Sequence, residues 1–227
     1  MLGGLAAGGA ALALRAQAQQ PAADGEALAE QLVIAMGGRE PWRAARGLSI
    51  EATHYEAVFA EPYENVLYIG LEEARMRFEG RNAKMRRIRA VVGERGWRVS
   101  EVSPLGPMTP EQVKGDRDWW EAHPYRNVRR LAVRDPAVTP RAGPDGRLEL
   151  VRPDGRRLMW YRLNPAGEPY AFGVGDSDTG VVLGPLAEVA GGVRLPIWSA
   201  RMDGTFRATG QKGRVMPTVP PVDYDKP

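Results

Sequence analysis

The strongest constraint on the fold is a change in the spacing of apolar residues at Gly47. From this point apolar residues recur at every second position in short segments, which are separated by glycine, asparagine, aspartate and proline. Such alternation predicts strands with one buried face, and short turns between them predict hairpins. Two Pro-Asp-Gly turns, ending at Gly146 and Gly155, supply the positive φ that tight hairpins need. The sequence therefore predicts an antiparallel meander.

Two segments interrupt the alternation with helical spacing. Residues 24–36 place apolar side chains on one helical face and end at Gly37, which favours a left-handed C-terminal cap. Residues 109–134 open with a capping box at Thr109 and are divided by Pro124. The expected order is a helix, about five strands, two helices and about five strands.

These elements predict an α+β fold built on a strongly curved antiparallel sheet. About ten strands with so few helices do not obviously close into a barrel. We therefore expect an unclosed half-barrel, with the N-terminal helix and the mid-chain helical insert covering its concave face. A slip in the alternation near Thr53 and His54 predicts a bulge in the first long strand, with Tyr55 in the opposite phase from Ile50 and Ala52.

The two ends of the chain differ from its body. An apolar run over residues 2–14, followed by Ala16-Gln17-Ala18, is typical of a secretory signal peptide; a disordered Ala/Gly tail is the alternative. We predict a signal peptide over residues 1–18, one half-barrel domain over 19–210 and an extended proline-rich tail over 211–227. Since no apolar run reaches bilayer-spanning length, we expect a soluble, monomeric protein in the periplasm.

Composition and motifs narrow the function. The chain has no cysteine, which excludes disulfides, thiol catalysis and thiolate metal sites. A net charge of +3 over 227 residues lacks the excess expected of a nucleic-acid-binding face. HExxH, GxSxG and glycine-rich phosphate loops do not occur. We expect a protein that is not an enzyme, with no catalytic residues, no metal site and no cofactor.

Two weak signals leave a hydrolase as an alternative. Asp178-Thr179-Gly180 matches the tripeptide of aspartic proteases, but it lies in a Gly/Asp/Ser-rich turn. His123 follows Asp118 by five residues, a spacing that does not stack on a helix face. We favour a turn and a helix-end histidine over a catalytic site at either place.

The order of elements resembles the LolA-like periplasmic lipoprotein-carrier superfamily. The resemblance rests on the leading helix that ends in MGGREPWRAARGLSIEATHY, the strand start at Gly96-Trp97, the meander, the helical insert and the strand return. It covers roughly residues 22–210 and is one of organisation more than motif. It implies a half-barrel whose apolar cavity, under covering helices, holds and transports the acyl chain of a lipid or of an acylated protein. No functional residue is carried over from the family.

Two adjacent tryptophans in the insert suit such a cover. Trp119 and Trp120 are about 100° apart on a helix, so together they form a broad apolar face. We expect this face to lie over an apolar floor, although the same residues could close an ordinary core. The predicted ligand-binding residues are Trp119, Trp120, Trp97, Trp160, Phe172 and Trp198.

Arginines alternate with apolar residues between Arg75 and Arg98, which predicts one arginine-rich face of the sheet. The predicted docking residues for anionic head groups or an acidic partner are Arg86, Arg87 and Arg89. A solvated outer face is the plainer interpretation. The alternative function is thus an envelope sensor or scaffold of the same fold, which docks a protein partner through this face without lipid transport.

Overall fold

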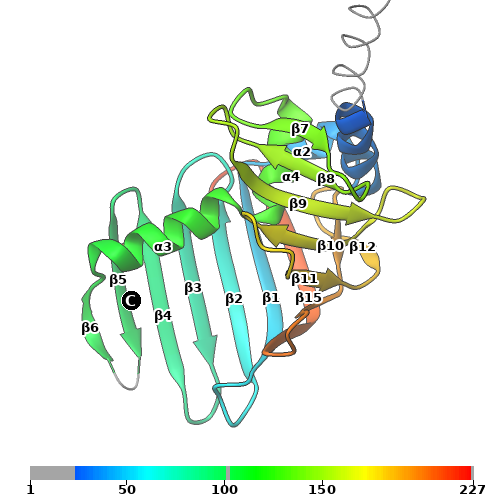
Figure 1. Cartoon of the computed structure of the whole chain (residues 1–227). Helices are drawn as coiled ribbons and strands as arrows, with labels where there is room; N and C mark the ends of the chain where they lie inside the picture. The colour runs from blue at the N-terminus through cyan, green and yellow to red at the C-terminus, as the bar shows by residue number, and fades with distance from the viewer. Residues whose placement is uncertain (1–23, 101–102, 226–227) are drawn as a thin grey trace, which may run out of the picture.

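The computed structural model describes residues 24–100 and 103–225 and contains one large, curved antiparallel sheet (Figure 1). Its 13 strands follow the order β6-β5-β4-β3-β2-β1-β15-β14-β11-β10-β9-β8-β7. The edge strands β6 and β7 do not pair with each other, so the sheet is an unclosed half-barrel. The predicted α+β fold class is confirmed, while the predicted signal peptide lies outside the described residues.

The first half of the sheet is a simple meander in chain order. Its strands are β1 (Gly47–Glu56), β2 (Tyr63–Gly70), β3 (Arg75–Arg81), β4 (Arg86–Val92), β5 (Arg95–Ser100) and β6 (Ser103–Pro107). Each strand pairs antiparallel with the next, as the short turns in the sequence predict.

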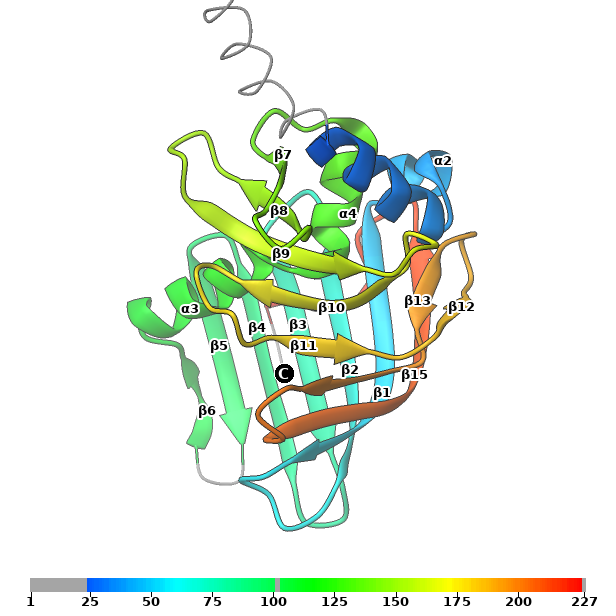
Figure 2. The same cartoon turned by 45° about the vertical axis from the view of Figure 1, so that its right-hand side comes forward.

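The second half of the sheet begins with β7 at the edge opposite β6, and its later strands lie progressively closer to β1. Its strands are β7 (Thr139–Ala142), β8 (Leu148–Val151), β9 (Arg157–Leu163), β10 (Pro169–Val174), β11 (Val181–Leu183), β14 (Trp198–Arg201) and β15 (Phe206–Met216). β15 pairs with β1 and joins the two halves (Figure 2). A separate two-stranded sheet pairs β12 (Leu186–Glu188) with β13 (Arg194–Pro196).

The described residues form 15 strands, more than the expected ten, partly because prolines divide two predicted strands and partly because β6 and β7 lie where no strand was predicted. Gly184-Pro185 separates β11 from β12, and Pro196 ends β13 before β14 begins. A proline has no N–H to donate to the ladder, which favours a break at these two places.

The helical insert links the two free edges of the half-barrel. It consists of α3 (Pro110–Glu121) and α4 (Pro124–Val133), which follow β6 and precede β7. The connection must cross from one edge to the other, so α3 runs past β2–β5 and α4 lies beneath β9 (Figures 1 and 2). Residues 24–35 are also helical, and α2 (Arg39–Ala44) follows them.

The hydrophobic core lies at the end of the sheet where these helices gather. Leu32 of the first helix, Trp42 of α2 and Val128 of α4 have no exposed surface. They belong to one apolar cluster with Leu148 and Leu150 of β8. This end of the half-barrel is therefore filled by side chains.

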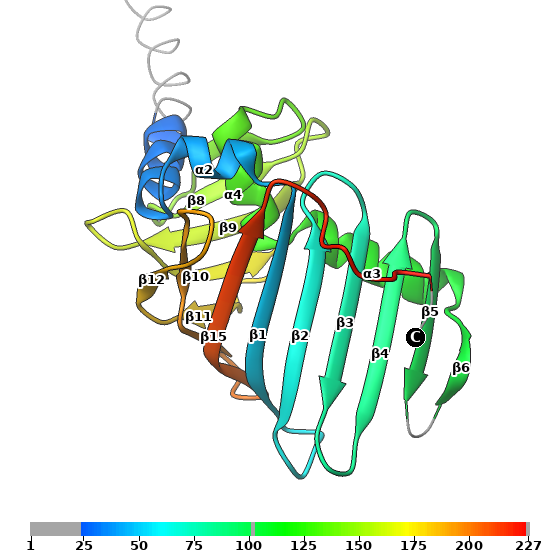
Figure 3. The ribbon, with the colours of Figure 1, turned by 180° about the vertical axis from the view of Figure 1, so that it is seen from behind.

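The C-terminal segment differs from the predicted tail. Residues 211–216 belong to β15, and the extended segment begins after Met216. It then crosses the outer, convex face of the sheet (Figure 3). The Trp97 indole Nε1 donates to the Tyr224 carbonyl at 2.6 Å, and Arg77 Nη1 donates to the Asp223 carbonyl at 2.6 Å. These bonds hold the segment against the sheet.

Candidate functional site

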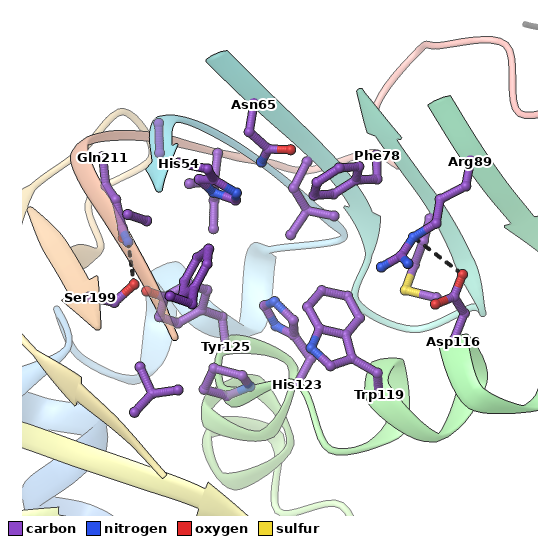
Figure 4. A pocket seen from close by; sticks show the side chains of 18 of the residues that line it. His54, Asn65, Phe78, Arg89, Asp116, Trp119, His123, Tyr125, Ser199 and Gln211 are labelled. Carbon is purple, nitrogen blue, oxygen red and sulfur yellow. Dashed lines mark hydrogen bonds and ion pairs between the residues drawn. The ribbon is translucent and has the colours of Figure 1, made fainter. Parts of the chain in front are cut away.

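A cavity of about 390 Å³ lies between the concave side of the sheet and the junction of α3 with α4 (Figure 4). Strands β1–β4 form one wall, β10, β11, β14 and β15 form another, and the insert forms the third. Ligand pockets in proteins commonly measure about 300–1,000 Å³. The cavity is thus large enough for a small apolar ligand.

The floor of the cavity is an apolar row across three neighbouring strands. Ile50 of β1 lies opposite Leu67 of β2, which lies opposite Phe78 of β3. Residues directly opposite each other on antiparallel strands point to the same face. All three side chains therefore line the cavity.

The phase of β1 places two polar side chains on this floor. Ala52, His54 and Glu56 follow Ile50 at alternate positions, and all four line the cavity. The predicted irregularity is present between β1 and β15, but the extra residue lies in β15, where Gly210 has a φ of 63°. The expected change of phase within β1 is therefore wrong.

Local signals in the sequence position the helical wall. Thr109 Oγ1 accepts a bond from the Gln112 amide at 3.3 Å, and Gln112 Oε1 accepts one from the Thr109 amide at 3.0 Å, which fixes the start of α3. Pro124 begins α4, so the chain bends between the two helices. At this bend the rings of Trp119 and His123 lie edge to face at 4.7 Å and border the cavity (Figure 4).

The cavity reaches solvent beside Trp119 and Arg89. Both residues line it, yet Trp119 is 42% exposed and the Arg89 side chain 51% exposed. Arg89 Nε lies 3.5 Å from Asp116 Oδ2 of α3. Burial raises the pKa of Asp116, while the nearby Arg89 charge acts in the opposite direction. The positively charged Arg89 side chain therefore lies at the opening, next to the partly buried carboxyl group of Asp116.

A closed polar network occupies the far part of the cavity. Arg87 Nη2 donates to Glu56 at 2.6 Å, and its guanidinium carbon lies 4.6 Å from the centroid of the Tyr63 ring. The Tyr63 hydroxyl donates to Glu56 and lies 3.3 Å from His54 Nδ1. Burial lowers the pKa of His54 to about 4, so this ring is neutral at pH 7. The Arg87 charge is balanced by Glu56.

Two further polar side chains enter the cavity from opposite sides. Asn65 projects from β2 and His123 from the start of α4 (Figure 4), and they are 3% and 4% exposed. Among the residues that the structure describes, Asn65 Oδ1 and His123 Nδ1 have no hydrogen-bond partner. Burial, followed by the charge of Arg126, lowers the pKa of His123 to about 3, so its imidazole is neutral.

Of the six predicted ligand-binding residues, Trp119 and Phe172 line the cavity. Trp120 is buried on the other side of α3, where its Nε1 donates to the Gly70 carbonyl at 2.6 Å. The two indoles are therefore divided between a cavity wall and the core. Adjacent helical residues differ by about 100°, which is enough to separate them in this way.

The other three tryptophans do not line the cavity. Trp160 is fully buried and donates to the Ser177 carbonyl at 2.8 Å, because it points to the opposite face of β9 from Tyr161. Trp97 lies on the convex face beneath the C-terminal segment, and Trp198 is 38% exposed on β14. The expectation that these residues share one floor is corrected accordingly.

The predicted arginine-rich docking face is also corrected. Arg87 and Arg89 point into the cavity, whereas Arg86 occupies the alternate phase of β4. Arg77 lies on the convex face, where its Nε donates to Glu79 at 2.5 Å. The arginines are thus divided between the two faces of the sheet.

Asp178, the first of the two hydrolase signals, is paired with an arginine in the part of the chain that the structure describes. Asp178 lies exposed in a turn, and its carboxylate accepts a bond from Arg147 Nη1 at 2.9 Å. This bond, together with the Arg147 charge, lowers the pKa of Asp178. A proton shared between two carboxylates requires the opposite shift in one of them.

Within residues 24–100 and 103–225, no three or more His, Asp or Glu side chains gather so as to hold a metal ion. No helix in the same ranges is both long and apolar enough to span a bilayer.

Sequence reasoning missed Asn65, His54 and Asp116 as cavity residues. Asn65 could have been found, because it alternates in phase with the apolar residues Leu67 and Ile69 of the same strand. His54 was missed because the bulge was placed in the wrong strand. Asp116 carries no such signal, since its position depends on how α3 crosses the sheet.

The comparisons with known proteins give little further information. No family model matches the chain, and no curated protein matches it. Among solved structures, the chain is similar to a DUF1329 family protein from Desulfovibrio piger, with 10% sequence identity and a TM-score of 0.40. The match covers 86% of this chain and 93% of that protein. The function is therefore inferred from the cavity itself.

Proposed function

We propose that this chain is an exported, periplasmic binding protein that holds the acyl chain of a lipid or of an acylated protein. The observation that supports this most strongly is the cavity of about 390 Å³ with its apolar floor of Ile50, Leu67 and Phe78. The resemblance to LolA-like carriers implies the same use of a half-barrel, namely transport of an acylated cargo.

Burial of a hydrocarbon chain would supply the driving force. Each methylene group removed from water contributes about 0.8 kcal/mol, so about ten of them contribute about 8 kcal/mol. A free energy of this size corresponds to a dissociation constant of about 1 µM. Ordering of the ligand lowers the net affinity, and contacts at the opening raise it.

The opening suits the head group of such a ligand. A carboxylate or phosphate beside Arg89 would take the place of the Asp116 carboxyl group, which lies 3.5 Å from the arginine and is poorly solvated. Movement of α3 away from the sheet would widen this opening and ease entry of the chain. Gly115 within α3 and Pro124 after it are the two points where this segment bends most readily.

Titration with a fluorescent fatty acid tests the proposal. We expect Trp119→Ala to weaken binding at least fivefold and to change the melting temperature little, because this side chain lines the cavity while 42% exposed. Trp198→Ala is the matched control, since Trp198 is 38% exposed and lies outside the cavity. Equal affinities in the wild type and both variants would contradict the proposal.

Native mass spectrometry provides a second test without an added ligand. Protein purified from its own cell envelope should carry a bound mass that corresponds to a lipid or an acylated peptide. The Trp119→Ala protein should carry less of it than the Trp198→Ala protein. A wild-type protein that neither carries a lipid mass nor binds any added fatty acid would overturn the proposal.

A further inference from the structure

The two buried polar side chains in the cavity have no role in a site for a plain hydrocarbon chain. Asn65 and His123 are each more than nine-tenths buried, and each has a side-chain atom without a hydrogen-bond partner among the described residues. An unsatisfied polar atom in an apolar surrounding is destabilising. A hydrocarbon chain packed between them would displace solvent and leave both atoms unsatisfied.

The charged side chains of the cavity have ionic partners, although the buried Nε of Arg87 has no hydrogen-bond partner among the described residues. Arg87 donates to Glu56, Gln211 Nε2 donates to Ser199 Oγ at 2.7 Å, and Arg89 lies beside Asp116. Asn65 and His123 are the two uncharged side chains of the cavity wall with a buried atom that lacks a partner among the described residues. They enter the cavity from β2 and from the start of α4 (Figure 4).

The chemistry of the pair indicates what could satisfy it. An amide offers both a donor and an acceptor, and a neutral imidazole does the same through its two ring nitrogens. A hydroxyl group donates one bond and accepts up to two, so it can bind either side chain whether the unpaired atom is a donor or an acceptor. A carboxylate inside the cavity would need a nearby cation, but the pKa of His123 is lowered to about 3, Arg87 is paired with Glu56 and Arg89 lies at the opening.

We propose that the preferred ligand carries a neutral hydroxyl group within its hydrocarbon chain, bound to the unpaired atom of Asn65 or of His123. This inference rests on the proposed function, because it assigns a ligand class to the same cavity. The site then distinguishes hydroxylated from plain chains: the hydroxyl satisfies the side chain beside it, and a methylene group at the same place leaves that side chain unpaired.

Competition between matched fatty acids tests the inference. A dansyl-labelled undecanoic acid is bound first and then displaced by hexadecanoic acid or by isomers of it with one hydroxyl group, at the 3, 9 or 12 position. We expect at least one isomer to bind about tenfold more tightly than the plain acid, the ratio for one additional satisfied hydrogen bond. Each isomer reports a different depth in the cavity.

Two variants test whether Asn65 and His123 cause the preference for a hydroxylated chain. Asn65→Leu and His123→Phe keep the approximate shape of each side chain and remove its hydrogen-bonding atoms. In at least one of the two variants we expect the preference for the hydroxylated acid to fall to less than threefold, while plain hexadecanoic acid binds as well as before or better. Because an unsatisfied buried group is removed, the melting temperature of Asn65→Leu should stay the same or rise.

The outcomes separate the inference from the proposed function. If the wild type binds plain and hydroxylated acids equally, or if the preference survives in both variants, water satisfies the two side chains and the inference is wrong. The lipid-binding function stands in that case. If no fatty acid of either kind displaces the probe or binds directly, the proposed function itself fails.

Discussion

The two halves of the curved sheet differ in what fills their concave side. In the half that contains β7–β10, helix 24–35, α2 and α4 pack onto the strands and leave Trp42 and Leu150 without exposed surface. In the half that contains β1–β4, the row through Leu67 and Phe78 faces a cavity. The same kind of sheet thus forms a solid core at one end and a hollow at the other.

The difference arises from where the covering helices lie. The α4 residues Val128 and Leu131 are buried in the core cluster, so this helix fills the space it covers. On α3, Val113 and Trp120 are buried, whereas Trp119 is 42% exposed at the opening of the cavity. A curved sheet therefore needs inserted helical side chains to become a core, and where they are missing it can receive a ligand.

The largest expected effect compares one truncation in each half. Leu150→Ala should lower the free energy of unfolding by about 2–5 kcal/mol, because it opens a void in a packed core. Leu67→Ala should cost about half as much, since this side chain already borders a cavity and makes fewer contacts. Urea denaturation measures both. Equal losses would mean that the two halves are packed alike.

Acid should destabilise the cavity half through its two buried histidines. Their folded pKa values, about 4 for His54 and about 3 for His123, lie below the unfolded value of 6.5. The unfolded chain thus binds more protons in this range, so stability is full above pH 6.5 and falls as pH decreases toward 4. We expect a loss of about 2–4 kcal/mol between pH 6.5 and pH 5.

A substitution of His123 tests whether this residue causes part of the acid sensitivity. His123→Phe keeps the ring and removes the titrating group, so its stability should change less than that of the wild type between pH 6.5 and pH 5. Denaturation at a series of pH values measures the difference. A variant with an unchanged pH profile would show that His123 is already protonated, or is accessible to solvent, in the folded protein.

One substitution made in both halves sharpens the comparison further. Ala52→Leu fills part of the cavity, so it should reduce fatty-acid affinity at least tenfold with a stability change of less than about 1 kcal/mol. Ala132→Leu adds the same atoms to the packed α4, where overpacking should cost about 1–3 kcal/mol and leave the affinity of the folded protein unchanged. The reverse pattern would place the void at the other end of the sheet.

The smallest expected effect concerns the mobility of α3. Gly115 lies within this helix and has open space around it, so Gly115→Ala should fit and stabilise the protein by about 0.5–1 kcal/mol. A stiffer helix should also slow ligand entry without changing the cavity. Stopped-flow fluorescence measures the entry rate, and a rate equal to that of the wild type would argue against movement of α3.

The sequence predicted the features that depend on neighbouring residues. Alternation and turn residues predicted the half-barrel, and the capping box at Thr109 and the break at Pro124 predicted the two helices of the insert. The phase of β2 would also have identified Asn65. In each case the signal lies within a few residues of the element that it describes.

The features it did not predict depend on packing between distant segments. Whether Trp119 or Trp120 faces the cavity depends on how α3 is rotated against β2–β5, and the sequence of α3 favours neither. The bulge was placed in β1, although the required positive φ belongs to Gly210 on the partner strand. The cavity is lined by side chains from many separate segments, so no local pattern in the sequence indicates it.

Contact quenching by a brominated fatty acid tests the central claim most directly. Bromine atoms in the chain of dibromostearate quench an indole that they touch, and Trp119 is the tryptophan that lines the cavity. We predict that the ligand quenches part of the tryptophan fluorescence of the wild type and of Trp198→Phe, and that this component disappears in Trp119→Phe. Quenching of the same size in all three proteins, or none in the wild type at saturation, would contradict a chain bound in this cavity.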